Sequence, residues 1–153
     1  MALPNIFNKD VTEHIIRRIE ALTPASKPLW GKMNVSQMLA HLNVTYQFIY
    51  KPEQFKPVPG LMKFVLKLLV KPMVVNEKPY PKNGRTAPEF LVSNEKDFLK
   101  EKDELIGYIE KTQQLGAAYF EGKEARSFGK LTSTEWNNLF YKHLDHHLRQ
   151  FGE

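Results

Sequence analysis

The sequence predicts an all-α protein, namely an antiparallel four-helix bundle with long crossover connections and an additional short amphipathic helix. Four long segments place apolar residues at helical spacing, and no segment alternates convincingly with a period of two. The connections between these segments are rich in proline and glycine. The 153 residues, 42% hydrophobic and 25% charged, suit one compact domain spanning residues 1–153.

The first two helices are predicted from their start signals and apolar faces. Asp10 can cap a helix over about residues 11–22, whose apolar face comprises Ile15, Ile16, Ile19 and Leu22. This helix is followed by Thr23, Pro24 and Pro28, which end it. Asn34 and Gln37 then have the spacing of a capping box, so a second helix is expected to run to about Tyr50.

A long connection follows the second helix. Residues 51–60 hold three prolines and a glycine and are expected to form a crossover loop. In residues 61–71, lysines at 63, 67 and 71 share one side of a short helix, and the other side is apolar, with Leu61, Phe64, Val65, Leu68 and Leu69. This helix is too short to span a membrane. Residues 72–88 contain four prolines and predict an ordered but irregular excursion over the surface.

The C-terminal half predicts two more helices. Asn94 or Ser93 can open the third, which Gly116 closes, and its core stripe comprises Phe98, Leu105, Ile106 and Ile109. A loop through two glycines, Gly122 and Gly129, then reaches a second capping box formed by Thr132 and Glu135. The last helix is expected to run nearly to the C-terminus. Because the connections are long, the topology need not be simply up and down.

Three of the five histidines lie within residues 143–147 of the last predicted helix. At ~100° per residue, His143 and His147 share the core-facing third of this helix with Phe140, Leu144 and Phe151. Their separation of four residues puts the imidazoles one turn apart, with Cβ atoms ~6 Å apart, which suits two ligands of one metal ion. His146 falls at the edge of the apolar arc and Asp145 points away, so neither is expected to be a ligand.

A third ligand must come from another helix. His41 lies within a wide apolar arc of the second helix, whereas His14 lies nearer the boundary of the first helix's apolar face. We therefore predict a metal site of His41, His143 and His147. Burying imidazoles without partners costs ~1 to 3 kcal/mol each. The alternative is a set of core histidines that are satisfied by hydrogen bonds to the protein.

The chain contains no cysteine, so imidazoles and carboxylates are the available side-chain ligands for a metal. Three neutral nitrogens leave at least one coordination position for water, as in catalytic sites. Zinc and nickel both suit imidazole. The ion would lower the pKa of a bound water or thiol and so produce a nucleophile at neutral pH. No catalytic role is assigned to Trp30, Trp136, Tyr46 or Tyr141.

Other classes of function find less support. The net charge is +5 and the pI is about 9.3, but the basic residues are spread along the chain, so no nucleic-acid partner is expected. The first ten residues lack the pattern of a secretory signal, which predicts a cytoplasmic location. Glycine-rich nucleotide-binding motifs and a Gly-x-Ser-x-Gly nucleophile elbow are absent from the sequence.

Two blocks of sequence resemble the DinB-like, or YfiT-like, superfamily of four-helix bundles, and within it a branch of unknown function. The blocks are Trp30-Gly31-Lys32-Met33 leading into residues 36–42, and residues 128–132 leading into Trp136 and residues 141–148. The resemblance covers almost the whole chain. The superfamily takes one metal ligand from the second helix and two from the last, which map onto His41, His143 and His147. It implies a thiol-linked activity, because characterised relatives include transferases acting on bacillithiol or mycothiol and a maleylpyruvate isomerase. It also implies a homodimer.

Three hypotheses follow for function. The first is a metal-dependent transferase or hydrolase acting with a small-molecule substrate, such as a low-molecular-weight thiol. The second is a non-catalytic small-molecule-binding or dimeric interaction module in which the metal is structural or absent; a closed coordination sphere would favour it. In the third, residues 61–71 bind a membrane surface without insertion across it. The simpler expectation is that this helix covers the bundle or a partner subunit.

Overall fold

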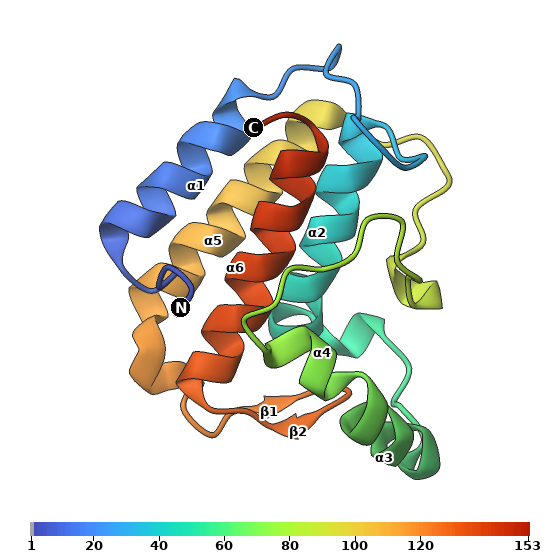
Figure 1. Cartoon of the computed structure of the whole chain (residues 1–153), viewed down its shortest axis with the longest axis vertical. Helices are drawn as coiled ribbons and strands as arrows, with labels where there is room; N and C mark the ends of the chain where they lie inside the picture. The colour runs from blue at the N-terminus through green and yellow to red at the C-terminus, as the bar shows by residue number, and fades with distance from the viewer. Residues whose placement is uncertain (1) are drawn as a thin grey trace.

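The computed structural model describes residues 2–153 and is mainly α-helical (Figure 1). The helices are α1 (Lys9–Ala21), α2 (Val35–Tyr50), α3 (Gly60–Leu69), α4 (Lys71–Val75), α5 (Phe98–Phe120) and α6 (Ser133–Gln150), with single 3-10 turns η1 (Pro52–Gln54) and η2 (Pro88–Phe90). A two-residue strand, β1 (Glu124–Ala125), pairs antiparallel with β2 (Gly129–Lys130). This hairpin, in the predicted glycine loop, is a small departure from the all-helical prediction.

The four long helices α1, α2, α5 and α6 pack side by side (Figure 1). α2 and α5 run in the same direction, since Gln37 contacts Asn94 near their starts and Tyr50 contacts Thr112 further along both. α6 runs opposite to α2 and parallel to α1 (Figure 1). The long connection between residues 50 and 98 makes the parallel α2–α5 pair possible, so the arrangement is not simply up and down.

The core lies between these four helices and is continuous with the residues just before α1. Its fully buried members share aliphatic or aromatic side chains and come from every long helix; they include Ile6, Ile15, Ile19, Met38, Leu39, Leu42, Tyr46, Leu105, Ile109, Phe120, Phe140 and Leu148. Removing these side chains from water is the main favourable term that holds the helices together. The same packing fixes the helices that carry the histidines.

Both predicted capping boxes are present. The Asn34 side chain accepts a hydrogen bond from the backbone N–H of Gln37, whose side chain accepts one from the N–H of Asn34. Thr132 and Glu135 make the equivalent pair of bonds at the start of α6. Each box satisfies two N–H groups that a helix start leaves without partners. The predicted ends of α2 and α6 are close to the observed ones.

Two other helix starts were predicted at the wrong residues. Asp10 does not cap α1: the helix begins at Lys9, and Asp10 lies in the first turn, where a carboxylate favours the helix dipole. Neither Ser93 nor Asn94 opens α5. Its N-cap is Asp97, whose carboxylate accepts from the N–H of Lys100, directly before the apolar stripe begins. Several residues in each segment are able to cap, and tertiary packing selects among them.

Gly116 interrupts α5 rather than ending it. Its φ of 72° and ψ of 170° lie outside the helical region. Glycine adopts such a positive φ without steric cost because it has no Cβ. Helical turns resume beyond this kink and end at Phe120, which is fully buried against Phe7 and Trp136. Burial of this aromatic side chain favours continuing the chain past the glycine.

The predicted short helix at 61–71 is divided in two. α3 ends at Leu69, and a second short helix, α4, occupies residues that were expected to be irregular. Pro72 explains the break, because it has no N–H to continue the ladder but fits the first turn of a new helix. In the described part of the chain, 2–153, no helix has the length and apolarity needed to cross a membrane.

Candidate metal centre

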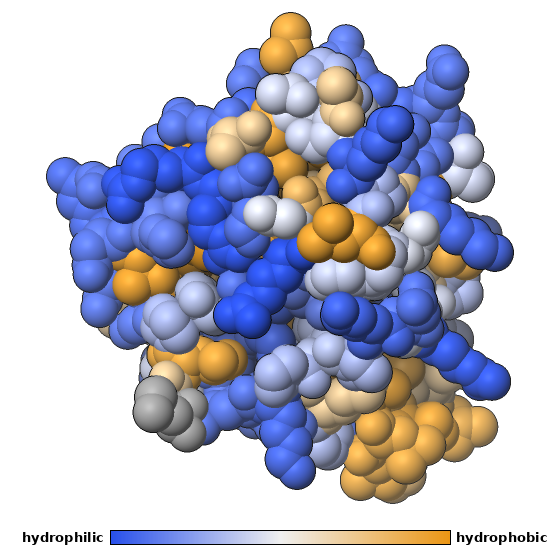
Figure 2. Space-filling model, turned by 45° about the horizontal axis from the view of Figure 1, so that its top comes forward, coloured by the Kyte–Doolittle hydropathy of each residue, from blue (hydrophilic) through white to orange (hydrophobic). Residues whose placement is uncertain are grey.

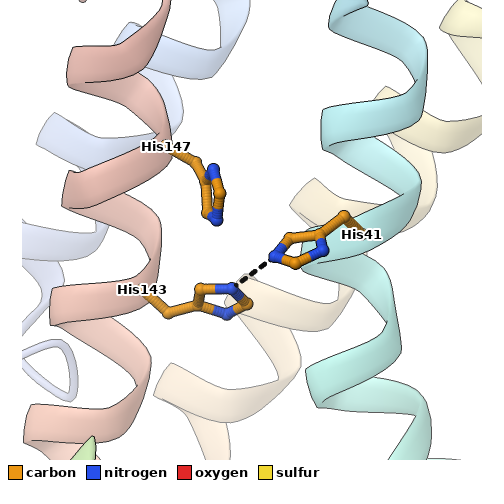
Figure 3. Close-up of side chains that lie close together, drawn as sticks. All are labelled: His41, His143 and His147. Atoms are coloured by element: carbon orange, nitrogen blue, oxygen red, sulfur yellow. Dashed lines mark hydrogen bonds between the residues drawn. The ribbon is translucent and has the colours of Figure 1, made fainter. Parts of the chain in front are cut away.

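Three imidazoles from two helices converge between α2 and α6 (Figure 3). His41 comes from α2, and His143 and His147 come from successive turns of α6. One nitrogen of each ring lies within 4.8 Å of the corresponding nitrogens of the other two. The Nε2 atoms of His41 and His143 are 2.9 Å apart. The structure therefore brings together the three residues that the sequence singled out.

Local helix geometry and tertiary packing both contribute to this convergence. Residues four apart on α6 share one face, which aligns His143 with His147. Leu144 and Leu148, each next to one of these histidines, are fully buried and set the rotation of α6. The equivalent anchor on α2 is Leu42, which is fully buried beside His41. The apolar core thus orients the polar rings toward one point.

Each ring is held by a hydrogen bond at its other nitrogen, Nδ1. His41 Nδ1 lies 2.9 Å from the carbonyl oxygen of Phe90, and His143 Nδ1 lies 3.0 Å from Thr45 Oγ1. His147 Nδ1 lies 2.8 Å from Gln150 Oε1. In metal sites, second partners of this kind fix the orientation and tautomer of ligand histidines.

The partners determine where the protons lie without a metal. The Phe90 carbonyl can only accept, so His41 carries its proton on Nδ1 and its Nε2 has a free lone pair. The short contact between His41 and His143 then requires His143 Nε2–H to donate, and Thr45 donates to His143 Nδ1. A cation bound by His143 Nε2 would instead require the ring proton on Nδ1. Thr45 Oγ1 can accept a hydrogen bond from that N–H.

The Gln150 amide orients the third ring. Its Nε2 donates to the carbonyl oxygen of Trp30 at 2.7 Å, which turns Oε1 toward His147. His147 therefore donates from Nδ1 and presents a free lone pair on Nε2. Gly31 makes this contact possible: it has a φ of 83°, and a Cβ there would lie 2.5 Å from Gln150 Nε2.

Burial keeps the three imidazoles neutral. It lowers the pKa of His41, and it lowers the pKa of His143 well below the ordinary value, with a further contribution from the neighbouring histidines. Burial, followed by the proximity of His41, lowers the pKa of His147 to about 3. Neutral imidazole is the form that ligates a metal, so at neutral pH few protons compete for this site.

Two aromatic residues of the connection between α4 and α5 pack near the site. The Phe90 ring packs on His41 and His143, with ring centres 5.3 and 5.9 Å away. Tyr80, from the same connection, packs on His146, which also contacts His147. Residues 72–88, which were predicted to run over the surface, thus contribute Tyr80 to the surroundings of the site, and Phe90 follows just beyond them.

The remaining residues weighed as site candidates lie elsewhere or play other roles. His14 is exposed on α1, and Asp145 pairs with Arg18 and Arg149, as expected for a side chain pointing away from the site. His146 is half-buried between Trp30 and Tyr80. Three aromatic residues without an assigned role are core or near-core residues: Trp136 and Tyr46 are buried, and Tyr141 is half-buried.

Sequence reasoning missed several residues that support the site. Thr45 follows His41 by four residues and Gln150 follows His147 by three, so helical spacing alone could have indicated both. Phe90 carried no signal, since it comes from an irregular connection. Lys142 was also missed: its ammonium is buried, donates to the carbonyl oxygens of Met73 and Asn76, and has a pKa lowered by burial to about 8. It ties α6 to α4 and to the residue that follows it.

The fold and site define a mainly helical protein with a buried triad of histidines able to hold a metal ion. The chain belongs to the family described as protein of unknown function DUF1569, whose match spans residues 7–153. No curated protein and no solved structure matches the chain.

Proposed function

We propose that this protein binds one divalent metal ion, zinc or nickel, through Nε2 of His41, His143 and His147. The observation that carries the proposal is the convergence of three neutral imidazoles whose Nδ1 atoms all have partners. Zinc–nitrogen bonds of ~2.0–2.1 Å in tetrahedral geometry need nitrogens ~3.3 Å apart. The observed spacing brackets this value, since the His41 and His143 nitrogens are 2.9 Å apart and all three ligand nitrogens lie within 4.8 Å of one another.

The proposal includes a fold assignment. The long helices form one four-helix bundle of the DinB-like or YfiT-like type, as a single domain over residues 1–153. Two observations support it: α1, α2, α5 and α6 share one core, and the ligands come from the second and last long helices. Homodimer formation and a cytoplasmic location, where small thiols stay reduced, belong to the same proposal.

The proposed activity is a metal-dependent transfer or hydrolysis with a small-molecule substrate, such as a low-molecular-weight thiol. A bound ion would supply a nucleophile by lowering the pKa of a thiol or water. The chain contributes three neutral ligands and no thiolate, which leaves a position open for the substrate. Ligation through His143 Nε2 would place the ring proton on Nδ1, from which it would donate a hydrogen bond to Thr45 Oγ1, and Phe90 packs against two of the three rings.

A specific observation favours a second candidate, a non-catalytic protein in which the metal is structural. His41 and His147 are buried, and Phe90 covers two of the rings. Two surface clefts, of about 290 and 250 Å³, are lined by residues other than the triad. A small molecule bound in either cleft would not contact the triad.

Metal binding is tested by elemental analysis and zinc titration of protein purified without a histidine tag. We expect one metal equivalent per chain, lost in His143→Ala and retained in His14→Ala, because His14 is an exposed histidine outside the site. Equal metal content in the two variants would contradict the site.

Cobalt substitution separates the two candidate functions. The visible spectrum of bound cobalt reports coordination by added ligands. If the site is catalytic, titration with a small thiol changes this spectrum in the wild-type protein, and activity requires His143. A spectrum that is unaffected by thiols, anions and pH favours the structural metal.

A further inference from the structure

The helix α3 exposes its apolar side to solvent. Figure 2 shows an apolar patch at the lower right, where α3 lies in Figure 1. The exposed fractions are 79% for Leu61, 52% for Met62, 60% for Phe64, 39% for Val65, 57% for Leu68 and 73% for Leu69, and Met73 of α4 adds 48%. The simpler expectation was that this helix covers the bundle or a partner subunit; within the single chain its apolar side does not cover the bundle, and cover by a partner subunit stays a prediction.

Charged contacts hold α3 in this orientation. Lys63 pairs with Glu124 of β1 at 2.6 Å, and Lys71 pairs with Glu135 of α6 at 2.9 Å. Between them, Leu66 and Val70 are half-buried. Lys71 belongs to the first turn of α4, so on α3 itself the side that carries Lys63 and Leu66 faces the protein body and the apolar side faces outward. An amphipathic helix on a monomer usually lies the other way round.

The charged side chains of α3 and α4 themselves are all positive. The segment from residue 60 to 75 contains three lysines and no acidic residue. Lys67 is exposed at the border of the apolar side, and Lys56 and Lys130, from segments near α3, are exposed as well. An apolar side bordered by lysines complements a surface whose interior is apolar and whose outer layer carries negative charge.

We propose that α3 docks this protein on an anionic lipid surface. Its apolar side would lie at the boundary of headgroups and acyl chains, ~5–10 Å deep, with the helix axis in the membrane plane. Lys67 reaches anionic headgroups at the rim, because lysine stems lie along apolar surface while the ammonium stays in water. A second copy of the chain fits less well, because a standard interface needs ~20–30 residues a side and this patch has seven.

Vesicle flotation tests the proposal on the full chain. The probes are phosphatidylcholine vesicles with and without phosphatidylglycerol, at low salt. We expect the protein to float with the anionic vesicles and less with the neutral ones. Leu68→Glu should lower partition at least about tenfold, because it puts a charge where the proposal places a leucine among acyl chains. Leu99→Glu is the matched control, since Leu99 is 66% exposed on α5.

Two further measurements keep the outcome decisive. Lys67→Glu leaves the apolar side intact and should still weaken binding to anionic vesicles, by about fivefold or more. Light scattering of the free protein reports oligomeric state. Absence of wild-type flotation, or flotation that Leu68→Glu leaves unchanged, overturns the proposal. A dimer that Leu68→Glu dissociates, without vesicle binding, assigns the patch to a second copy instead.

Discussion

The last helix, α6, turns polar imidazoles toward the protein interior, whereas α3 turns apolar side chains toward solvent. Both helices are amphipathic. Buried imidazoles and exposed apolar side chains are each unfavourable in free energy unless a partner group contacts them. On α6 the partners are within the chain: Thr45 and Gln150 bond Nδ1 of His143 and of His147, as the Phe90 carbonyl does for His41 of α2. On α3 no residue among 2–153 covers the apolar side. We therefore interpret the buried histidines and the exposed apolar side of α3 as two binding sites, one for a metal ion and one for a lipid surface.

The largest expected contrast is between leucines of the core and of α3. Leu105→Ala should lower the free energy of unfolding by about 2–5 kcal/mol, because it leaves a cavity in the core. Leu68→Ala should change it by less than about 0.5 kcal/mol, because that side chain is 57% exposed. Equilibrium denaturation of both variants measures the difference. A large loss in Leu68→Ala would mean that α3 is already covered in solution.

The next effect concerns the ring orientation on α6. Gln150→Leu removes the acceptor of His147 Nδ1 and should weaken zinc binding by ~10–100-fold, as loss of second partners does in metal sites. Calorimetric titration of zinc measures this change. Gln114→Leu, at an exposed position of α5, is the matched control and should bind zinc like the wild type. Equal affinities in both variants would show that Gln150 does not orient the ligand.

The pH dependence of stability should also distinguish the histidines of α6 from the apolar side of α3. The pKa of His147 falls from its unfolded value of 6.5 to about 3 on folding, so between these values the unfolded state binds more protons. The metal-free protein should therefore lose stability as pH falls through this window, by up to about 1.4 kcal/mol per pH unit from this residue.

Denaturation at several pH values, compared with a His147→Leu variant, isolates that contribution. The variant should show a shallower slope between pH 6.5 and 5, above the range in which most carboxylates titrate. Leu68→Ala should keep the wild-type slope, because α3 has no histidine. Parallel slopes in the wild type and His147→Leu would contradict burial of a neutral imidazole.

The smallest effect is expected at the helix starts. α6 has a side-chain cap and α3 has none, so only α6 can lose one. Thr132→Ala should cost about 1 kcal/mol of stability, with zinc affinity unchanged because the cap lies about three turns before His143. Thr134→Ala, exposed in the same turn, is the control. A change in zinc affinity in Thr132→Ala would show that fraying reaches the site.

The sequence by itself determined features that depend on local spacing. Apolar periodicity located the long helices, the capping boxes marked the starts of α2 and α6, and the four-residue interval aligned His143 with His147. These features need only helix geometry, which is the same wherever the helix lies. Positions with several competing caps, as before α1 and α5, were predicted wrongly because packing chooses among them.

Only the tertiary structure decided what meets each face. His41 approaches the α6 histidines because α2 and α6 run antiparallel in one core, and Phe90 and Trp30 reach the site from distant loops. The outward orientation of α3 likewise depends on Glu124 and Glu135, which are more than 60 residues away from the lysines they bind. A sequence pattern fixes which side of a helix is polar, but contacts between distant segments fix where that side points.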